Sequence, residues 1–126
     1  MKNIDDFACH FTDAIYSFIK YNILITNEDS VIAASGPLKK KFLNKNISES
    51  LITCIRRKEN IHEKYQKVLA IAEKEKVEAT YAMSTIINQG DPVGLVIIFS
   101  EDEAITESDM RICEIAAKIL SKYLDE

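Results

Sequence analysis

The sequence predicts an α+β fold built around one antiparallel sheet. Near both ends of the chain, apolar residues recur every three or four positions, which is the spacing of amphipathic helices. Between these segments lie short runs of β-branched residues separated by turn residues, and strands joined by tight turns are antiparallel neighbours. We therefore expect the order helix, two strands, helix, three strands, helix. The first and last helices should cover one face of the sheet, and the middle helix with its loops should cover the other.

The first helix is predicted over residues 4–19, and a hairpin follows it. The apolar stripe of this helix consists of Ile4, Phe7, Ala8, Phe11, Ile15, Phe18 and Ile19. The runs NILITN (22–27) and SVIAAS (30–35) predict two strands that are joined by a turn at Glu28 and Asp29. Gly36 and Pro37 are expected to end the second strand.

A lysine-rich loop or short turn leads from the hairpin to the middle helix. Asn46 is the predicted N-cap of that helix, because Glu49 stands three residues later and can complete a capping box. Apolar residues at helical spacing continue the helix to about Lys58. These residues are Ile47, Leu51, Ile52, Cys54 and Ile55.

Three strands are expected in the second half of the chain. Residues 65–72 and 77–87 predict two strands around the charged turn EKEK, and NQGDP predicts the next turn. The following strand, 93–100, contains an unbroken apolar run from Leu95 to Phe99. Because this run does not alternate with polar residues, both sides of the strand should be buried, and it should lie at the centre of the sheet. Gly94 is expected to let another element approach closely.

The last helix is predicted to begin at Thr106 and to run to about residue 124. Thr106 and Asp109 have the spacing of a capping box, and Ile105 is placed to contact Met110 as a hydrophobic staple. The apolar face of this helix consists of Ile112, Ile115, Ala116, Ile119, Leu120 and Tyr123.

Composition limits the classes of function. The chain has 126 residues, the size of one domain, and 16 basic residues against 20 acidic ones give a net charge of −4. This balance argues against direct nucleic-acid binding, which rests on the neutralisation of phosphates. The three cysteines lie far apart without a CxxC pair, which favours a reducing cytoplasm over a disulfide framework or a zinc site. The sequence has neither a signal peptide nor an apolar run of the ~20 residues that cross a bilayer, so no membrane association is expected.

Three stretches together carry a resemblance to a known family. They are Ser35-Gly36, then Phe42-Leu43-Asn44-Lys45 with Ile47-Ser48-Glu49, and finally Asn88 to Asp102, which contains GDPVGLVIIFSED. In this order they resemble the C-terminal GAF domain of the stage V sporulation protein T family, which are AbrB-type sporulation transcription regulators. The resemblance extends from about Asp6 to Tyr123 and is weakest between Ile55 and Val77.

The resemblance implies a GAF-like fold and a regulatory role. Members of the family carry an N-terminal swapped-hairpin DNA-binding domain and assemble through the terminal helices of the GAF domain. GAF domains as a class bind small molecules on the sheet face opposite those helices. Residues 1–126 are therefore expected to form a single GAF-like domain that lacks the DNA-binding hairpin. Whether the chain is an excised domain or a stand-alone relative is left open by the sequence.

A ligand pocket is predicted between the sheet and the segment 37–58. On strand 77–87, Tyr81, Met83 and Thr85 share one side, and Ser84 lies on the other with Ala82. The sequence does not say which side faces the pocket, and the alternative is that all of these residues are simply core. The predicted pocket residues are Ser35, Phe42, Leu51, Ile55, Tyr81, Met83, Ser84 and Thr85. They are mostly apolar with a few hydroxyls, as small-ligand sites usually are.

A homodimer is predicted through the terminal helices. Their apolar stripes exceed what one sheet face requires, and the excess can pair with a second copy as a four-helix bundle. The predicted interface residues are Ile4, Phe7, Phe11, Ile115, Ile119, Tyr123 and Leu124. The preferred hypothesis is thus a regulatory domain that senses a small molecule and mediates homo-oligomerisation. The alternative is a pure dimerisation domain without a ligand.

Enzymatic chemistry is a remote alternative. Cys54 stands close to Arg56 and Arg57, and cations lower the pKa of a thiol, as a cysteine-dependent redox enzyme needs. A half-buried structural cysteine is the better interpretation, since no second cysteine accompanies it. Asp6 and His10 share a helix face, and Glu59 and His62 are three residues apart, but two ligands make a weak metal site. The sequence therefore predicts no catalytic residue, no metal and no cofactor.

Overall fold

A five-stranded antiparallel sheet forms the middle layer of the protein in the computed structural model, which describes residues 4–125. Its strands are β1 (Asn22–Thr26), β2 (Val31–Ser35), β3 (Asn60–Ala72), β4 (Glu75–Asn88) and β5 (Asp91–Ser100). They lie side by side in the order β2-β1-β5-β4-β3, with every neighbouring pair antiparallel. This topology confirms the predicted α+β class and places β5 at the centre.

The apolar run in β5 serves both faces of the sheet. Leu95, Ile97 and Phe99 belong to one buried cluster, and Val96 and Ile98 belong to another on the opposite side. All five are fully buried. The central position predicted for this strand is therefore confirmed, and the run supplies two cores at once.

Gly94 allows β1 and β5 to approach each other closely, as predicted. A Cβ atom at this position would lie 2.0 Å from the backbone oxygen of Thr26. No side chain fits within that distance, so glycine is required where β5 enters its pairing with β1.

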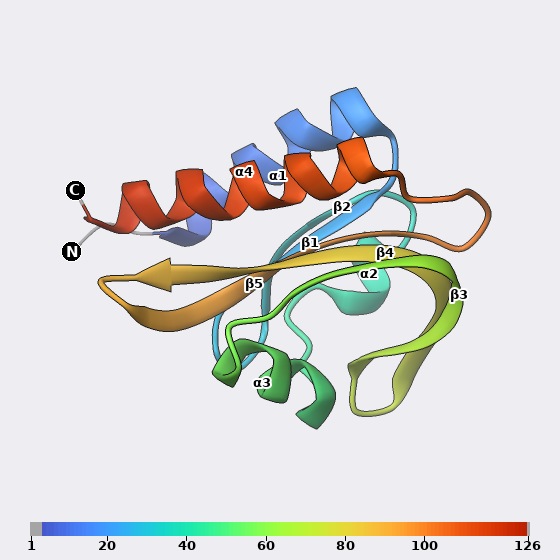
Figure 1. The fold of residues 1–126 in the computed structure, drawn as a ribbon, viewed down its shortest axis with the longest axis horizontal. Helices are drawn as coiled ribbons and strands as arrows, with labels where there is room; N and C mark the ends of the chain where they lie inside the picture. Colours follow the sequence, from blue (N-terminus) through green and yellow to red (C-terminus); the bar gives the residue numbers. More distant parts are fainter. Residues whose placement is uncertain (1–3, 126) are drawn as a thin grey trace.

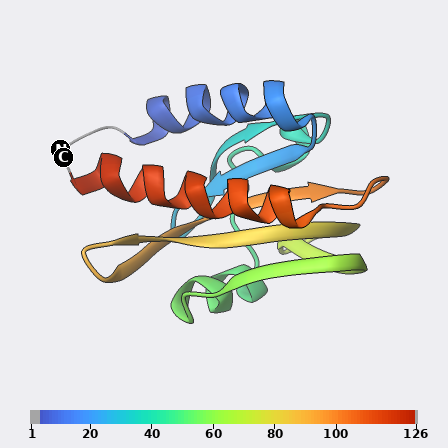
Figure 2. The ribbon, with the colours of Figure 1, turned by 45° about the horizontal axis from the view of Figure 1, so that its top comes forward.

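Two long helices cover one face of the sheet. Figures 1 and 2 show α1 (Ile4–Ile19) and α4 (Glu107–Asp125) side by side above the strands, running in opposite directions. Ala8 of α1 and Cys113, Ala116 and Leu120 of α4 are buried against the sheet. Short helices lie on the opposite face, namely α2 (Lys39–Phe42) and α3 (Glu49–Arg56). The predicted distribution of the helices over two faces is confirmed.

The N-terminal cap predicted from the sequence is confirmed for α4 and is wrong for α3. At α4, Thr106 N–H donates to Asp109 Oδ2 (2.8 Å) and Asp109 N–H donates to Thr106 Oγ1 (3.2 Å), which is the predicted capping box. At α3 the predicted cap, Asn46, is wrong: Ser48 is the N-cap, and its hydroxyl accepts from Leu51 N–H (3.2 Å). Asn46 instead pairs with Ser30 in an isolated β-bridge, which keeps it extended and outside the helix.

Strand β3 is longer than the sequence indicated. The prediction began this strand at residue 65, whereas it begins at Asn60, so the segment around His62 belongs to the strand. His62 pairs with Ala82 of β4, and its Nε2 lies 2.7 Å from the backbone oxygen of Ile105. The polar composition of this half hid the strand. A strand at the edge of a sheet is often charged, because charge discourages pairing with other chains.

Candidate functional site

The outer surface of α1 and α4 carries an apolar seam between the two helices. The ring of Phe7 stacks on that of Tyr123 with centroids 4.2 Å apart, and on that of Phe11 with centroids 5.4 Å apart. These contacts join the first turns of α1 to the last turn of α4. Stacked rings of this kind contribute about 0.5–1.5 kcal/mol beyond the burial of their surface. The seam is therefore a fixed feature of the helix layer.

A groove of about 780 Å³ runs along α4 beside this seam, and we refer to it as the terminal-helix groove. It is lined by Phe7, Arg111, Glu114, Ile115, Lys118, Ile119, Lys122 and Tyr123. Ile115 is 58% exposed and Ile119 is 42% exposed. Contiguous apolar surface of this kind, rimmed by polar side chains, is typical of an interaction site.

A second hollow of about 360 Å³ lies toward the other end of the same helix pair. It is lined by Ala14, Ile15, Phe18, Ile19 and Ile112. Phe18 is 90% exposed, more than any other large apolar side chain among the described residues. The helix layer thus presents apolar surface near both of its ends.

The structure brings the predicted interface residues together on this layer. Ile115 and Ile119 are exposed, and Phe7, Phe11 and Tyr123 are half-buried. The remaining two, Ile4 and Leu124, are half-buried and pack partly against the cluster beneath the helices. Phe18 was assigned to the stripe of the helix but not to the interface. Its spacing from Phe11 places it on the same stripe, but spacing alone does not tell which residues of a wide stripe the sheet covers.

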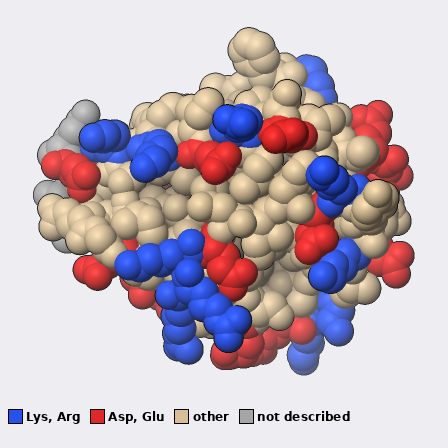
Figure 3. All heavy atoms as spheres, viewed as in Figure 1, with Lys and Arg blue, Asp and Glu red and all other residues tan. Residues whose placement is uncertain are grey.

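Charged side chains of both signs follow α4 along the upper part of the molecule in Figure 3. Arg111, Lys118 and Lys122 give the rim of the terminal-helix groove a basic excess over Glu114. Helix α1 differs, since Asp5, Asp6 and Asp13 are its formally charged residues at neutral pH. One helix of the pair is therefore acidic, and the other borders its groove mainly with basic groups.

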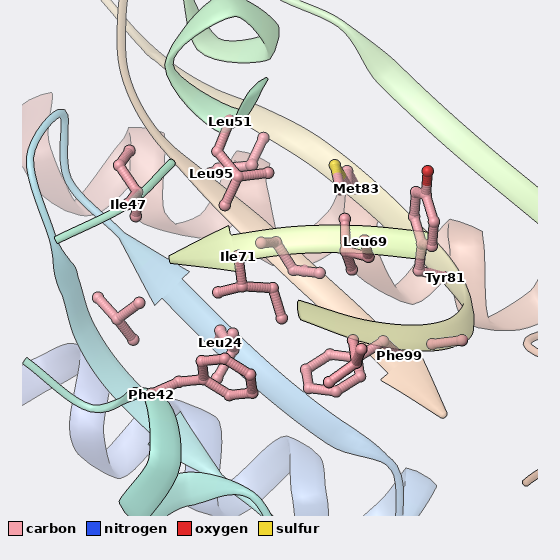
Figure 4. Packing of buried hydrophobic residues seen from close by; sticks show 14 of the residues in the cluster. Leu24, Phe42, Ile47, Leu51, Leu69, Ile71, Tyr81, Met83, Leu95 and Phe99 are labelled. Atoms are coloured by element: carbon pink, nitrogen blue, oxygen red, sulfur yellow. The ribbon is translucent and has the colours of Figure 1, made fainter. Parts of the chain in front are cut away.

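The opposite face of the sheet is closed by packed side chains (Figure 4). Phe42 from α2 and Leu51 and Ile55 from α3 meet Tyr81 and Met83 of β4 in one buried cluster. The Phe42 ring stands edge-on to that of Phe99, with centroids 6.1 Å apart and planes at 80°. Five of the predicted pocket residues therefore lie together on the predicted face, and they form part of a core.

The three predicted pocket residues with short hydroxyl side chains behave differently. Ser35 faces α1, where its Oγ lies 3.0 Å from Thr12 Oγ1 and bonds to the Asp13 carboxylate. Ser84 donates to Asn60 Oδ1 (2.6 Å) at the flank of α4. Thr85 donates to the backbone oxygen of Glu59 (2.8 Å), one position further along β4. Ser35 and Ser84 thus lie on the helix-covered face, away from Phe42 and Leu51, and the structure does not bring the predicted set into one site.

The cysteines show no arrangement for nucleophilic chemistry within residues 4–125. Burial raises the pKa of the Cys54 thiol, and nearby Glu59 raises it further, against a smaller lowering by Arg57. Burial likewise raises the pKa of Cys113, which is enclosed between α4 and the sheet. Cys9 is exposed on α1, and all three thiols are free. A thiol with a raised pKa stays protonated near neutral pH and is a poor nucleophile.

In residues 4–125, no three His, Cys, Asp or Glu side chains gather as a metal site would require. The same residues contain no helix that is both long and apolar enough to cross a membrane.

Comparison with known sequences identifies relatives over the whole domain. A family model described as "Stage V sporulation protein T C-terminal, transcription factor" matches residues 3–125. Stage V sporulation protein T of Bacillus subtilis (strain 168) is 32% identical over 127 residues, an alignment that covers 100% of this chain and 71% of the relative.

Solved structures share the fold at low sequence identity. The GAF domain of an Acinetobacter phosphoenolpyruvate-protein phosphotransferase has a TM-score of 0.76 at 10% identity and covers 97% of this chain and 82% of its own. The cofactor-binding GAF domain of the nutrient sensor CodY from Clostridium difficile has a TM-score of 0.68 at 13% identity, covering 92% and 83%. A type II free methionine-R-sulfoxide reductase from Thermoplasma acidophilum scores 0.67 at 15% identity, covering 95% and 94%. At these identities the likeness concerns the fold alone, and it confirms the GAF-like architecture predicted from the sequence.

Proposed function

Because this chain belongs to the stage V sporulation protein T C-terminal family and is a regulatory GAF-like domain of a sporulation transcription factor, we propose that it regulates by self-association through its terminal helices. Two copies would pack α1 and α4 against α1 and α4 of the partner as a four-helix bundle. In a transcription factor, such a bundle would fix the spacing of two DNA-binding units. A role beside DNA also supports the predicted cytoplasmic location.

The observation that carries this proposal is the exposure of large apolar side chains on helices that already have a buried face. Ile115 and Ile119 line the terminal-helix groove, and Phe18 extends the apolar surface toward the other end of the layer. Each would gain about 1.5–3 kcal/mol from full burial, an upper limit for side chains that are already partly covered. A second copy would present the same apolar surface, because each subunit of a twofold dimer contributes the same patch to the interface.

Charge supports the same arrangement. A twofold axis between the helix layers can bring the acidic α1 of one copy near the basic rim of α4 in the other. Such complementarity favours the correct encounter and register more than it adds affinity. It predicts that self-association weakens at high salt without being lost, because the centre of the surface is apolar.

Small-molecule sensing on the α3 face receives less support. A ligand within the packed cluster would have to displace Phe42, Leu51 or Met83, which are at most 2% exposed. The hollow of about 240 Å³ beside α3 contains only Ile55 of the predicted pocket residues. The segment that covers the packed cluster is tied to the hairpin by Asn44 N–H to Val31 O and Val31 N–H to Lys45 O, both 2.9 Å. The proposal is therefore an assembly domain first, and it does not need a ligand in that core. Enzymatic chemistry at Cys54 is also disfavoured, because the raised pKa of its thiol opposes thiolate formation.

The test is the mass of the domain in solution, measured by sedimentation velocity across a range of concentrations. Wild-type protein should be dimeric at micromolar concentration. Ile115→Glu should raise the dimer dissociation constant at least about a hundredfold, since it places an unpaired charge in the interface.

Val68→Glu is the matched control, because Val68 is 55% exposed on the edge strand β3 and lines neither hollow of the helix layer, while Ile115 is 58% exposed. The control should dimerise like the wild type. A monomeric wild-type domain, or equal weakening by both substitutions, would rule out the terminal helices as the interface.

A further inference from the structure

A small polar cavity lies between the flank of α4 and the strands β3 and β4. Its volume is about 160 Å³. The strands contribute Asn60, Ser84 and Thr85, and α4 contributes Glu114, Lys118 and Ser121. The cavity is on the same face of the sheet as the terminal helices. It is thus separate from the core under α3, where the ligand pocket was expected.

The hydroxyl groups of this cavity are set to accept hydrogen bonds. Ser84 already donates its proton to Asn60 Oδ1 (2.6 Å). Ser121 donates to the backbone oxygen of Ile87. A hydroxyl that has used its proton can still accept through its oxygen. These oxygens therefore suit a ligand group with several protons to donate, such as an ammonium.

Two opposite charges at the mouth remain without a partner. Glu114 and Lys118 are four residues apart on α4, a spacing that commonly gives an ion pair. Within residues 4–125, no ion pair involves either of them. Among the residues that the structure describes, the Asn60 amide nitrogen likewise has no hydrogen-bond acceptor, although its oxygen accepts from Ser84. The cavity thus offers a carboxylate and hydroxyl oxygens as acceptors, and an ammonium and an amide N–H as donors.

We propose that this α4-flank cavity binds a small zwitterion of amino-acid size. Glu114 and the hydroxyl oxygens would receive the ligand's ammonium group, and Lys118 with the Asn60 amide would receive its carboxylate. The methyl group of Ala117 and the side chain of Ile87 complete the lining and suit a short apolar or hydroxylated side chain. A ligand with only one of the two charges would leave one protein charge unpaired in the cavity.

The size of the cavity limits the ligand. A water molecule occupies about 30 Å³ of the liquid, so the cavity corresponds to about five waters. It lies below the range of about 300–1,000 Å³ that drug-sized ligands and cofactors use. Nucleotides and aromatic cofactors are therefore excluded from it, and glycine, alanine, serine and threonine are the amino acids closest in size.

The cavity is joined to the terminal-helix groove through shared side chains. Glu114 and Lys118 line both hollows. A ligand that holds Lys118 withdraws a basic group from the rim of the groove. If the proposed dimer pairs that rim with the acidic α1 of a partner, ligand binding weakens the dimer, and by linkage dimerisation weakens ligand binding equally. This coupling rests on the proposed function, whereas the ligand site does not.

The experiment is a titration of the ¹⁵N-labelled domain with glycine, L-alanine, L-serine and L-threonine in turn, followed by amide chemical shifts. At least one should saturably shift the amides of residues 84, 117, 118 and 121. Ethanolamine and 3-hydroxypropionate, which each carry one charge of serine, should bind at least tenfold more weakly. Lys118→Met and Glu114→Gln should each weaken binding at least tenfold.

Lys122→Met is the matched control, because Lys122 lines the terminal-helix groove but not the cavity. It should bind the amino acid like the wild type. The monomeric Ile115→Glu variant should bind at least as tightly as the wild type, because it lacks the dimer contacts that oppose binding. Binding by Ile115→Glu separates failure of the site from failure of the dimer. The proposal is overturned if none of the four amino acids shifts these amides, or if Lys118→Met and Lys122→Met bind alike.

Discussion

The two faces of the sheet differ in how completely their apolar residues are used. Under α2 and α3, the large side chains pack against one another, with Phe42, Leu51 and Met83 at most 2% exposed. Under α1 and α4 a second cluster is equally buried, but the outer side of the same helices is also apolar, with Ile115, Ile119 and Phe18 exposed. The large apolar side chains of the first face are buried within one chain. On the second face, the helices also expose apolar side chains that a partner would bury.

The comparison shows that apolar content alone does not locate a ligand pocket. In the apolar run of β5, Leu95, Ile97 and Phe99 point to the first face, and Val96 and Ile98 point to the second. Both halves are core. The polar cavity lies at the flank of α4, where the short side chain of Ser84 on β4 occupies less space than a large apolar side chain would.

The largest expected effect is on the closed face. Phe42→Ala removes a fully buried ring that contacts Phe99 edge-on, and it should lower the free energy of unfolding by about 3–5 kcal/mol. Tyr65→Ala is the control, since that aromatic side chain is 84% exposed on β3 and its loss should change stability by less than about 0.5 kcal/mol. Urea titrations of both variants measure the difference. Equal effects would mean that the face under α2 and α3 is loosely filled, and a ligand pocket there would regain support.

An intermediate effect on the free energy of unfolding is expected at the contact between β1 and β5, two strands that carry side chains to both faces. Gly94→Ala places a Cβ atom 2.0 Å from the Thr26 oxygen, so β1 and β5 must separate, at a cost of about 3 kcal/mol. Gly90→Ala meets no atom within 4 Å, but its φ of +86° disfavours alanine by about 1 kcal/mol. Chemical denaturation should rank the two variants in that order.

Amide shifts extend this test to the two faces. Gly94→Ala should disturb residues of both clusters, such as Leu24 and Ile25, because β1 carries side chains to both sides. Gly90→Ala should disturb the turn between β4 and β5 alone. Disturbance confined to one face in Gly94→Ala would contradict the close approach as the reason for this glycine.

Much of the fold could be predicted because periodicity reports which residues share a face. The stripe of α1 gave its bounds at residues 4 and 19, and the pattern Thr106 to Asp109 gave the start of α4. Periodicity does not report what covers a face. Ser84 and Tyr81 were correctly placed on opposite sides of one strand, but only the structure shows that Ser84 faces α4 and Tyr81 the layer of α3.

The other differences have the same kind of cause. The first half of β3 is polar because it lies at an edge, so composition hid a strand that pairing with β4 defines. Asn46 and Ser48 are both good caps, and the bridge from Ser30 to Asn46 decides between them. The α4-flank cavity combines residues of β3, β4 and α4 that are distant in sequence. No local pattern brings such residues together before the fold is known.

The smallest expected effect is a difference in alkylation rate among the three cysteines, which lie on helices of the two faces. Cys9 is exposed on α1, Cys54 is half-buried on α3 and Cys113 is buried under α4. Alkylation by iodoacetamide should therefore modify Cys9 first and Cys54 more slowly, because burial raises the pKa of Cys54 and leaves less thiolate. Cys113 should react only when the domain opens, since its thiol lies 3.2 Å from Val96 O beneath the helix. Peptide mass spectrometry over a time course gives the three rates.

The order of alkylation also distinguishes the two hypotheses for this chain, a regulatory domain and a cysteine-dependent redox enzyme. In urea the three thiols should react at similar rates, which controls for local sequence. Raising the pH should accelerate Cys54, because more of its thiol ionises as the pH approaches the raised pKa. If Cys54 instead reacted faster than Cys9 in the folded protein at neutral pH, it would be a thiolate stabilised by its surroundings. The face under α3 would then hold a reactive site, and the contrast between a closed face and an open one would fail there.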